Sequence, residues 1–237
     1  MIILKKLIII SVLILFSILI IVSFFNNNFE KASDDLSENT KPTIIVDAGH
    51  GGFDGGTSTE DGVPEKGINL SIALYLREYL NFLGFDVIMT READVSTEDD
   101  GLNTIRSRKS SDLHNRMSLM EDTENSIFVS IHQNHFSSSK YNGAQVFYSE
   151  NFSEISSGLA QNIQDSIVKN LQPDNNRKIK ICDESVFLIY NAVRPAVLVE
   201  CGFLSNFEEA ERLKTADYQK KLAFSIALGI LNYYEGQ

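Results

Sequence analysis

Apolar and polar residues follow two different patterns of spacing along the chain from residue 42 onward. Short β-branched runs such as 43–46 predict strands that are buried on both faces, which is typical of a parallel sheet. Longer stretches with apolar residues at helical spacing, such as 67–83 followed by Gly84, predict helices that cover such a sheet. We therefore expect one α/β domain with a central, mostly parallel sheet flanked by helices. The expected strands are 43–46, 85–90, 127–131, 143–148 and 196–199, and the expected helices are 67–83, 113–121, 153–171, 207–213 and 218–233.

One polar stretch, 92–112, interrupts this pattern. It carries Asp99, Asp100 and Gly101 near its centre and has no apolar run of its own. Long connections without regular structure are uncommon in compact domains, and those that occur are often functional. The stretch predicts a long, mobile loop ahead of the helix at 113–121.

The first 25 residues differ from everything that follows. Lys5 and Lys6 precede an uncharged, apolar run at 7–25, which as a helix would nearly cross a hydrocarbon core of about 30 Å. Lysines before the run and acidic residues after it predict a cytoplasmic N-terminus and an exported remainder. A cleaved signal peptide is the alternative, but the run is long for one and no small-x-small site follows it. We expect a transmembrane anchor at 1–25, a polar linker at 26–41 and a folded domain at 42–237.

Charge and cysteine content narrow the possible partners. The formal net charge of −11 argues against nucleic acid, because phosphate binding requires clustered lysines and arginines. The two cysteines, Cys182 and Cys201, cannot supply a disulfide framework. A single bridge between them remains open, but two buried thiols are the preferred interpretation.

Two expected strands end in segments that contain a histidine. His50 follows the first strand inside a glycine cluster, and His132 follows the strand at 127–131. A single loop histidine is more often a surface residue, but these are two of only four histidines in the chain. Neutral imidazoles on a rigid scaffold are good ligands for zinc, so the pair predicts a zinc site.

The sequence alone does not decide the roles of two acidic residues. Glu65 begins an expected helix, where a solvated first-turn acid is the stronger interpretation and a third metal ligand the weaker one. Glu200 directly follows the buried run at 196–199. A carboxylate there needs a partner or a task, so it is either a general base or half of a buried salt bridge to Arg91 or Arg194.

Four ordered motifs together resemble the zinc-dependent N-acetylmuramoyl-L-alanine amidases of the amidase-3, or LytC, type. The motifs lie at 45–52, 65–66, 130–134 and 195–206, and the resemblance extends over 43–233. It implies one zinc ion per chain and cleavage of peptidoglycan between N-acetylmuramic acid and L-alanine. By the same resemblance, His50, Glu65 and His132 are the zinc ligands and Glu200 is the catalytic glutamate.

The chain also departs from the family pattern in places that concern the substrate. Gln133 replaces a small residue, the stretch 95–112 is longer than usual, and an Ala-Asn pair expected after Arg116 is missing. With no wall-binding repeat, the chain is most similar to the spore-cortex subgroup of the CwlD type. Members of the family are often held inactive until a protein partner engages them, and the stretch 92–112 is a candidate place for such control.

Two other functions remain alternatives at this stage. One is a zinc peptidase that cuts within the stem peptide. The other is a non-catalytic wall-binding or regulatory module that keeps the fold, against which the presence of all four chemical residues argues.

Overall fold

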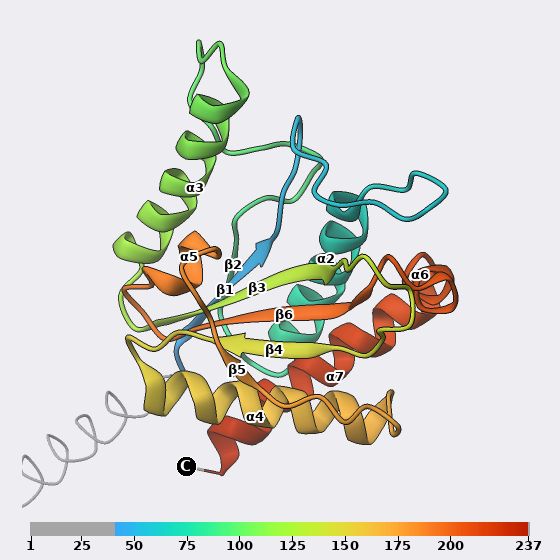
Figure 1. Ribbon diagram of the computed structural model, residues 1–237. Helices are drawn as coiled ribbons and strands as arrows, with labels where there is room; N and C mark the ends of the chain where they lie inside the picture. Colours follow the sequence, from blue (N-terminus) through green and yellow to red (C-terminus); the bar gives the residue numbers. More distant parts are fainter. Residues whose placement is uncertain (1–40, 237) are drawn as a thin grey trace, which may run out of the picture. The chain divides into compact units, whose positions relative to one another are not determined.

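A six-stranded sheet forms the centre of the part of the chain that the structure, a computed structural model, describes: residues 41–236. The strand order is β2-β1-β3-β6-β4-β5 (Figure 1). Neighbouring strands are parallel except for β4 and β6, which are antiparallel, so the expected mostly parallel α/β domain is confirmed. The strands are β1 (Thr43–Ala48), β2 (Val87–Met89), β3 (Ser126–Asn134), β4 (Gln145–Tyr148), β5 (Lys180–Ile181) and β6 (Ala196–Phe203).

Helices cover both faces of this sheet. Three of them, α2 (Glu65–Phe82), α4 (Ser153–Asn170) and α7 (Ala216–Glu235), lie on one face and build the larger core. The other face carries α3 (Ile105–Asp122) and the short α5 (Phe187–Tyr190), and α6 (Phe207–Leu213) packs beside the end of β6 (Figure 1). No helix among residues 41–236 is long and apolar enough to cross a membrane, and the expected anchor at 1–25 and most of the linker at 26–41 lie outside the described residues.

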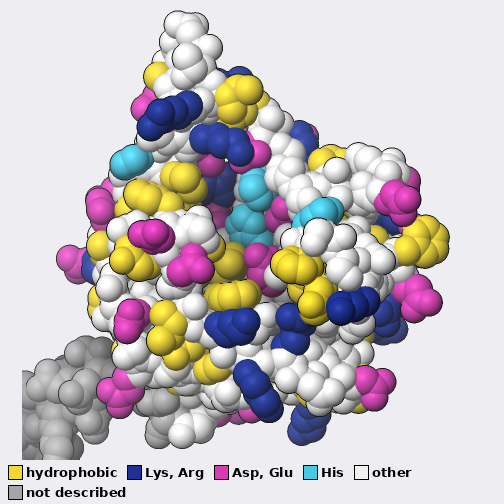
Figure 2. All heavy atoms as spheres, in the orientation of Figure 1, with side chains coloured by type: hydrophobic (Ala, Val, Ile, Leu, Met, Phe, Trp, Pro, Cys, Tyr) yellow, Lys and Arg dark blue, Asp and Glu magenta, His cyan; other side chains and the backbone are white. Residues whose placement is uncertain are grey.

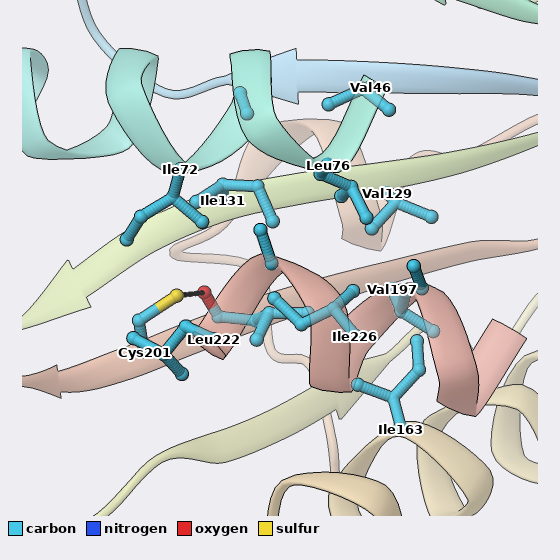
Figure 3. Close-up of a cluster of buried hydrophobic side chains, with 14 of the residues drawn as sticks. Val46, Ile72, Leu76, Val129, Ile131, Ile163, Val197, Cys201, Leu222 and Ile226 are labelled. Carbon is cyan, nitrogen blue, oxygen red and sulfur yellow. Dashed lines mark hydrogen bonds between the residues drawn. The ribbon is translucent and has the colours of Figure 1, made fainter. Parts of the chain in front are cut away.

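The larger core explains why the strands are continuous apolar runs in the sequence. Ile131 and Val197 point from the sheet toward Leu76 of α2 and Ile226 of α7, and all four side chains are buried (Figure 3). Each such side chain contributes roughly 1.5–3 kcal/mol by leaving water. The packing on this face holds the strands in fixed positions, which also fixes the side chains on the opposite face.

The opposite face of the same strands becomes polar toward one end. Asp47 of β1 pairs with Ser130 of β3, while His132 of β3 pairs with Glu200 of β6. Gln145 of β4 lies on the other side of Glu200. Residues directly opposite each other in paired strands point to the same face, so Asp47 and Ser130 form one row and His132, Glu200 and Gln145 a second row beside it.

Three expectations from the sequence need correction. The stretch 92–112 is not a loop throughout, because α3 begins at Ile105 with a capping box between Thr104 and Ser107. The strands β3 and β6 also run further than expected, because their pairing continues to Asn134 and Phe203. His132 and Glu200 therefore lie inside strands and not after them. The elements β5 and α5 were not expected at all.

Candidate metal centre and active site

His50 lies in the loop after β1, and two hydrogen bonds fix its position. Its φ is 61°, in the left-handed region that residues with side chains seldom occupy. Its carbonyl oxygen accepts a hydrogen bond from Arg116 at 2.8 Å, and its Nδ1 lies 2.9 Å from Asp54 Oδ2. This leaves Nε2 facing Glu65 Oε2 at 3.4 Å. A histidine held in this way through one ring nitrogen presents the other to a metal.

Glu65 is the first residue of α2, and its carboxylate is buried. Its Oε1 accepts hydrogen bonds from the backbone N–H of Gln133 and the side chain of Asn69, both at 3.0 Å. Burial alone would raise the pKa of Glu65, but the hydrogen bond with His132 and the charges of His132 and His50 outweigh it and hold the pKa at about 2. The solvated first-turn acid that the pattern favoured is therefore wrong, and Glu65 is an ionised carboxylate inside the domain.

His132 projects from β3 beside the His50 loop. Its Nδ1 lies 3.0 Å from Glu65 Oε1. A Cβ atom on Gly49 would lie 2.1 Å from His132 Nε2, so only glycine at position 49 leaves room for the ring. Burial lowers the pKa of His132, yet the hydrogen bond and charge of Glu65 outweigh that effect and raise it.

The structure brings the three predicted ligands together. One ligand atom from each of His50, Glu65 and His132 lies within 4.8 Å of the others, and the two imidazole rings are 4.9 Å apart between centroids. Histidine side chains are visible at the bottom of a hollow on this face of the domain (Figure 2). Two imidazole nitrogens and an ionised carboxylate converge there, so the cluster could hold a metal ion.

Glu200 lies in the same hollow, a cleft of about 340 Å³ that His50 and His132 also line. Its Oε2 is buried and has no hydrogen-bond partner within residues 41–236. Burial raises the pKa of Glu200 to about 7; the charge of His132 opposes this rise and the charge of Glu65 adds to it. A carboxyl group with such a pKa can both accept and return a proton near neutral pH.

The alternative of a buried salt bridge at Glu200 is wrong. Arg91 donates to the carbonyl oxygens of Ala48, Gly49 and Lys66. Arg194 donates to carbonyl oxygens at the end of α3 and just after it. Neither guanidinium pairs with Glu200.

A buried ionic cluster next to the cleft was missed by the sequence analysis. Arg116 Nη1 lies 2.5 Å from Asp47 Oδ1, and Arg116 Nε lies 3.0 Å from Asp112 Oδ2. Ser130 donates to the other oxygen of Asp47 at 2.5 Å. The only local signal was an acidic residue, Asp47, at the end of an apolar strand, and nothing in the sequence identified its partner.

One wall of the cleft is apolar and was also missed. Phe187, Leu188 and Ile189 of α5 line it together with Leu113 of α3. The helix has only four residues, too few to show a helical period in the sequence.

The remaining histidines and the cysteines lie outside the cluster, as expected. His114 and His135 are exposed. Cys182 and Cys201 are buried free thiols, which confirms the preferred interpretation over a disulfide.

Comparison with known proteins identifies the family of the chain. The family model described as N-acetylmuramoyl-L-alanine amidase matches residues 44–232. The germination-specific N-acetylmuramoyl-L-alanine amidase of Bacillus subtilis is 39% identical over 191 residues, covering 81% of this chain and 79% of the relative. The CwlD amidase of Clostridioides difficile, solved in complex with the GerS lipoprotein, has a TM-score of 0.79 and 40% identity, covering 83% of this chain and all of that one. A second amidase, from Clostridium difficile 630, has a TM-score of 0.69 and 28% identity, covering 84% of this chain and all of that one.

Proposed function

The chain belongs to the amidase-3 family of N-acetylmuramoyl-L-alanine amidases, within the CwlD-type subgroup, and on this premise we propose that it is a zinc hydrolase of peptidoglycan. In the proposed reaction it cuts the amide bond between N-acetylmuramic acid and L-alanine. One zinc ion per chain is held by His50, Glu65 and His132. The observation that carries the proposal is the convergence of these three residues in the cleft that also contains Glu200.

The residues present fit zinc. Two histidines and one carboxylate form the donor set of several hydrolytic zinc sites, which keep a further position open. The low pKa of Glu65 means that its carboxylate is ionised at neutral pH and offers a full negative charge. When bound, zinc supplies a Lewis acid that lowers the pKa of water toward about 7 and polarises the scissile carbonyl.

Glu200 is the proposed catalytic residue. Glu200 lines the cleft and its buried Oε2 has no hydrogen-bond partner among the described residues, so its carboxyl group can take a proton from the attacking water. The same carboxyl group then gives that proton to the leaving amine of L-alanine, because its pKa of about 7 suits both steps at neutral pH. No arginine or lysine neutralises Glu200 through an ion pair within the described residues, which keeps it available as a base.

The direct test combines metal analysis with product analysis. We expect about one zinc per purified chain and little in the variants His50→Ala and His132→Ala, with His135→Ala as a control histidine outside the cluster. Purified peptidoglycan should yield peptides with a new N-terminal L-alanine. A new amino terminus on a D-amino acid would instead identify a peptidase, and no cleavage with zinc bound would indicate a non-catalytic module.

We further propose where the enzyme works. The apolar run at 7–25 anchors the chain, and the linker at 26–41 holds the domain at 42–237 outside the cytoplasm. Deleting residues 1–25 should release the protein from the membrane fraction; a deletion variant that remains there would oppose the anchor.

Spore-cortex maturation is the proposed cellular role. One relative is named a germination-specific amidase, and another was solved in complex with a lipoprotein. We accordingly propose that an extracytoplasmic protein partner engages this chain. Loss of the gene should leave muramic acid peptide-substituted in spore peptidoglycan, which muropeptide mass spectrometry measures; an unchanged muropeptide profile would oppose the role.

A further inference from the structure

A row of polar side chains leads from the metal cluster toward the far edge of the sheet. Glu200 is paired with His132 on one side and with Gln145 on the other. Gln145 is buried, and its Oε1 accepts a hydrogen bond from Arg177 Nη1 at 3.2 Å. Its Nε2 donates to the carbonyl oxygen of Lys178 at 2.7 Å. Gln145 thus connects the catalytic strand to the segment that carries Arg177.

The guanidinium of Arg177 is held on three sides. Its Nε donates to the carbonyl oxygen of Asn142 at 2.8 Å, its Nη1 donates to Gln145, and its central carbon lies 4.4 Å from the centroid of the Phe203 ring. Its Nη2 takes part in no hydrogen bond or ion pair within residues 41–236. A planar guanidinium fixed in this way, with donors to spare, is well suited to bind a carboxylate.

Beside Arg177, a tethered loop at 135–143 presents two aromatic rings. Its ends are held by hydrogen bonds from Phe136 N to Ser205 Oγ and from Gly143 N to Glu209 Oε1. Phe136 is 51% exposed and Tyr141 is 38% exposed, with their ring centroids 5.0 Å apart. Exposed aromatic side chains on a loop that is already ordered indicate a contact surface, because little conformational entropy remains to be lost on binding.

The same region is positive on a strongly acidic chain. Lys140, Arg177, Lys178 and Lys180 form no ion pair among the described residues, although the chain carries a net charge of −11. By contrast, two lysines nearer the metal cluster are neutralised, Lys66 by Asp94 and Lys109 by Asp54. Lysine and arginine side chains also gather below the hollow in Figure 2. Four cations that form no ion pair among the described residues are therefore available in this region.

We propose that the Arg177 shelf, defined by Phe136, Lys140, Tyr141, Gln145 and Arg177, binds the stem peptide of the substrate through its free carboxylates. This inference rests on the proposed function and extends it to the leaving half of the substrate. Strands in a sheet are about 4.8 Å apart, so Gln145 lies one strand spacing from Glu200. Arg177 binds the far end of the Gln145 side chain, which places it roughly 10 Å from Glu200, the span of about three extended residues. In peptidoglycan the carboxylates are on the peptide, whereas the acetyl and lactyl groups of the glycan side suit the apolar wall of α5.

The test measures binding of a free stem tripeptide, in parallel with the same peptide whose carboxylates are carboxamides. The full-length protein is used as wild type, Lys140→Gln, Arg177→Gln and Arg177→Lys, with Lys169→Gln as a control for an exposed lysine on α4. We expect the Kd for the charged peptide to rise at least tenfold in Arg177→Gln and severalfold in Lys140→Gln. Binding of the carboxamide peptide should be weaker and equal in all variants.

Kinetics give a second, independent readout. For a muropeptide substrate, KM should rise in Arg177→Gln with little change in kcat, and for N-acetylmuramoyl-L-alanine, which lacks the later residues, neither should change. The proposal would be overturned if the two peptides gave equal Kd values in every variant. It would also be overturned if Arg177→Gln lowered kcat/KM equally for the muropeptide and for N-acetylmuramoyl-L-alanine. Wild-type hydrolysis of the muropeptide tests the proposed function separately, so a failure of the shelf alone leaves that activity intact.

Discussion

Replacing Arg116 with methionine should destabilise the domain by about 3–5 kcal/mol at neutral pH, the usual cost of removing one partner from a buried ion pair. Arg116 and Asp47 have side chains only 2% and 1% exposed, and their closest atoms are 2.5 Å apart. Without Arg116, the hydrogen-bond donors left to the Asp47 carboxylate among residues 41–236 are the hydroxyl groups of Ser130 and Thr90. Two hydroxyl hydrogen bonds do not neutralise a buried charge.

The pH dependence follows from the pKa of Asp47. Burial raises that pKa, but Arg116 and Ser130 outweigh burial and hold it below 3.8. In the wild type, Asp47 therefore contributes stability above its unfolded-state pKa and loses it as the pH falls through the lower folded-state pKa. In Arg116→Met, burial dominates and the folded-state pKa rises, so protonation favours the folded state. The free-energy difference between wild type and variant should shrink between pH 7 and pH 4.

Urea unfolding at both pH values measures this difference. The double variant Asp47→Asn/Arg116→Met should be less destabilised than the sum of the two single variants, because position 47 no longer holds a buried charge without its counter-charge. Arg106→Met, at an exposed position on the same helix, is the control and should change stability by no more than about 0.5 kcal/mol. The reasoning would be refuted if Arg116→Met lowered the free energy of unfolding equally at pH 4 and pH 7. It would also be refuted if the effects of the two single variants simply added in the double variant.

Three further predictions concern the metal and the catalytic residue. Glu200→Gln should lower kcat by about 10²–10⁴-fold with unchanged zinc content, and normal turnover would remove Glu200 from the mechanism. Gly49→Ala places a Cβ atom 2.1 Å from His132 Nε2, so zinc affinity should fall roughly 10–100-fold, whereas Gly67→Ala, with open space around it, should leave zinc affinity unchanged. Removing zinc should lower the free energy of unfolding by about 4 kcal/mol relative to a solution with zinc at 1,000 times its Kd, and equal thermal midpoints with and without chelator would contradict binding at a folded site.

The two histidines of the candidate metal site could be found from the sequence, but the state of Glu65 could not. His50 and His132 each come at or near the end of an apolar strand, which is a local signal. Glu65 has the sequence position of an ordinary helix-start acid, and its burial depends on contacts such as the backbone hydrogen bond from Gln133, far along the chain. Only the family motifs indicated its role before the fold was known.

The sequence did not predict the first half of α3, residues 105–112, for a related reason. Between residues 105 and 112 the only buried side chain is that of Asp112, so this half shows no apolar stripe, whereas the predicted second half buries Met117 and Met120. Asp112 and, later in the helix, Arg116 are buried because they bind Thr97 and Asp47 from other elements. Hydrophobic periodicity cannot reveal a helical segment whose one buried side chain is ionic.

Arg91 shows how the metal site depends on the fold as a whole. Its hydrogen bonds to the carbonyl oxygens of Ala48, Gly49 and Lys66 join the His50 loop to the first turn of α2, where Glu65 lies, yet Arg91 is not one of the proposed ligands. Arg91→Met should therefore weaken zinc binding without removing a ligand, because the His50 loop and Glu65 are no longer tied together. Since zinc binding and folding are linked, the loss in zinc-binding free energy must equal the extra destabilisation of the zinc-loaded form over the metal-free form. Calorimetric titration and unfolding with and without zinc measure the two quantities; a variant that is less stable but binds zinc with wild-type affinity would show that Arg91 supports the fold alone.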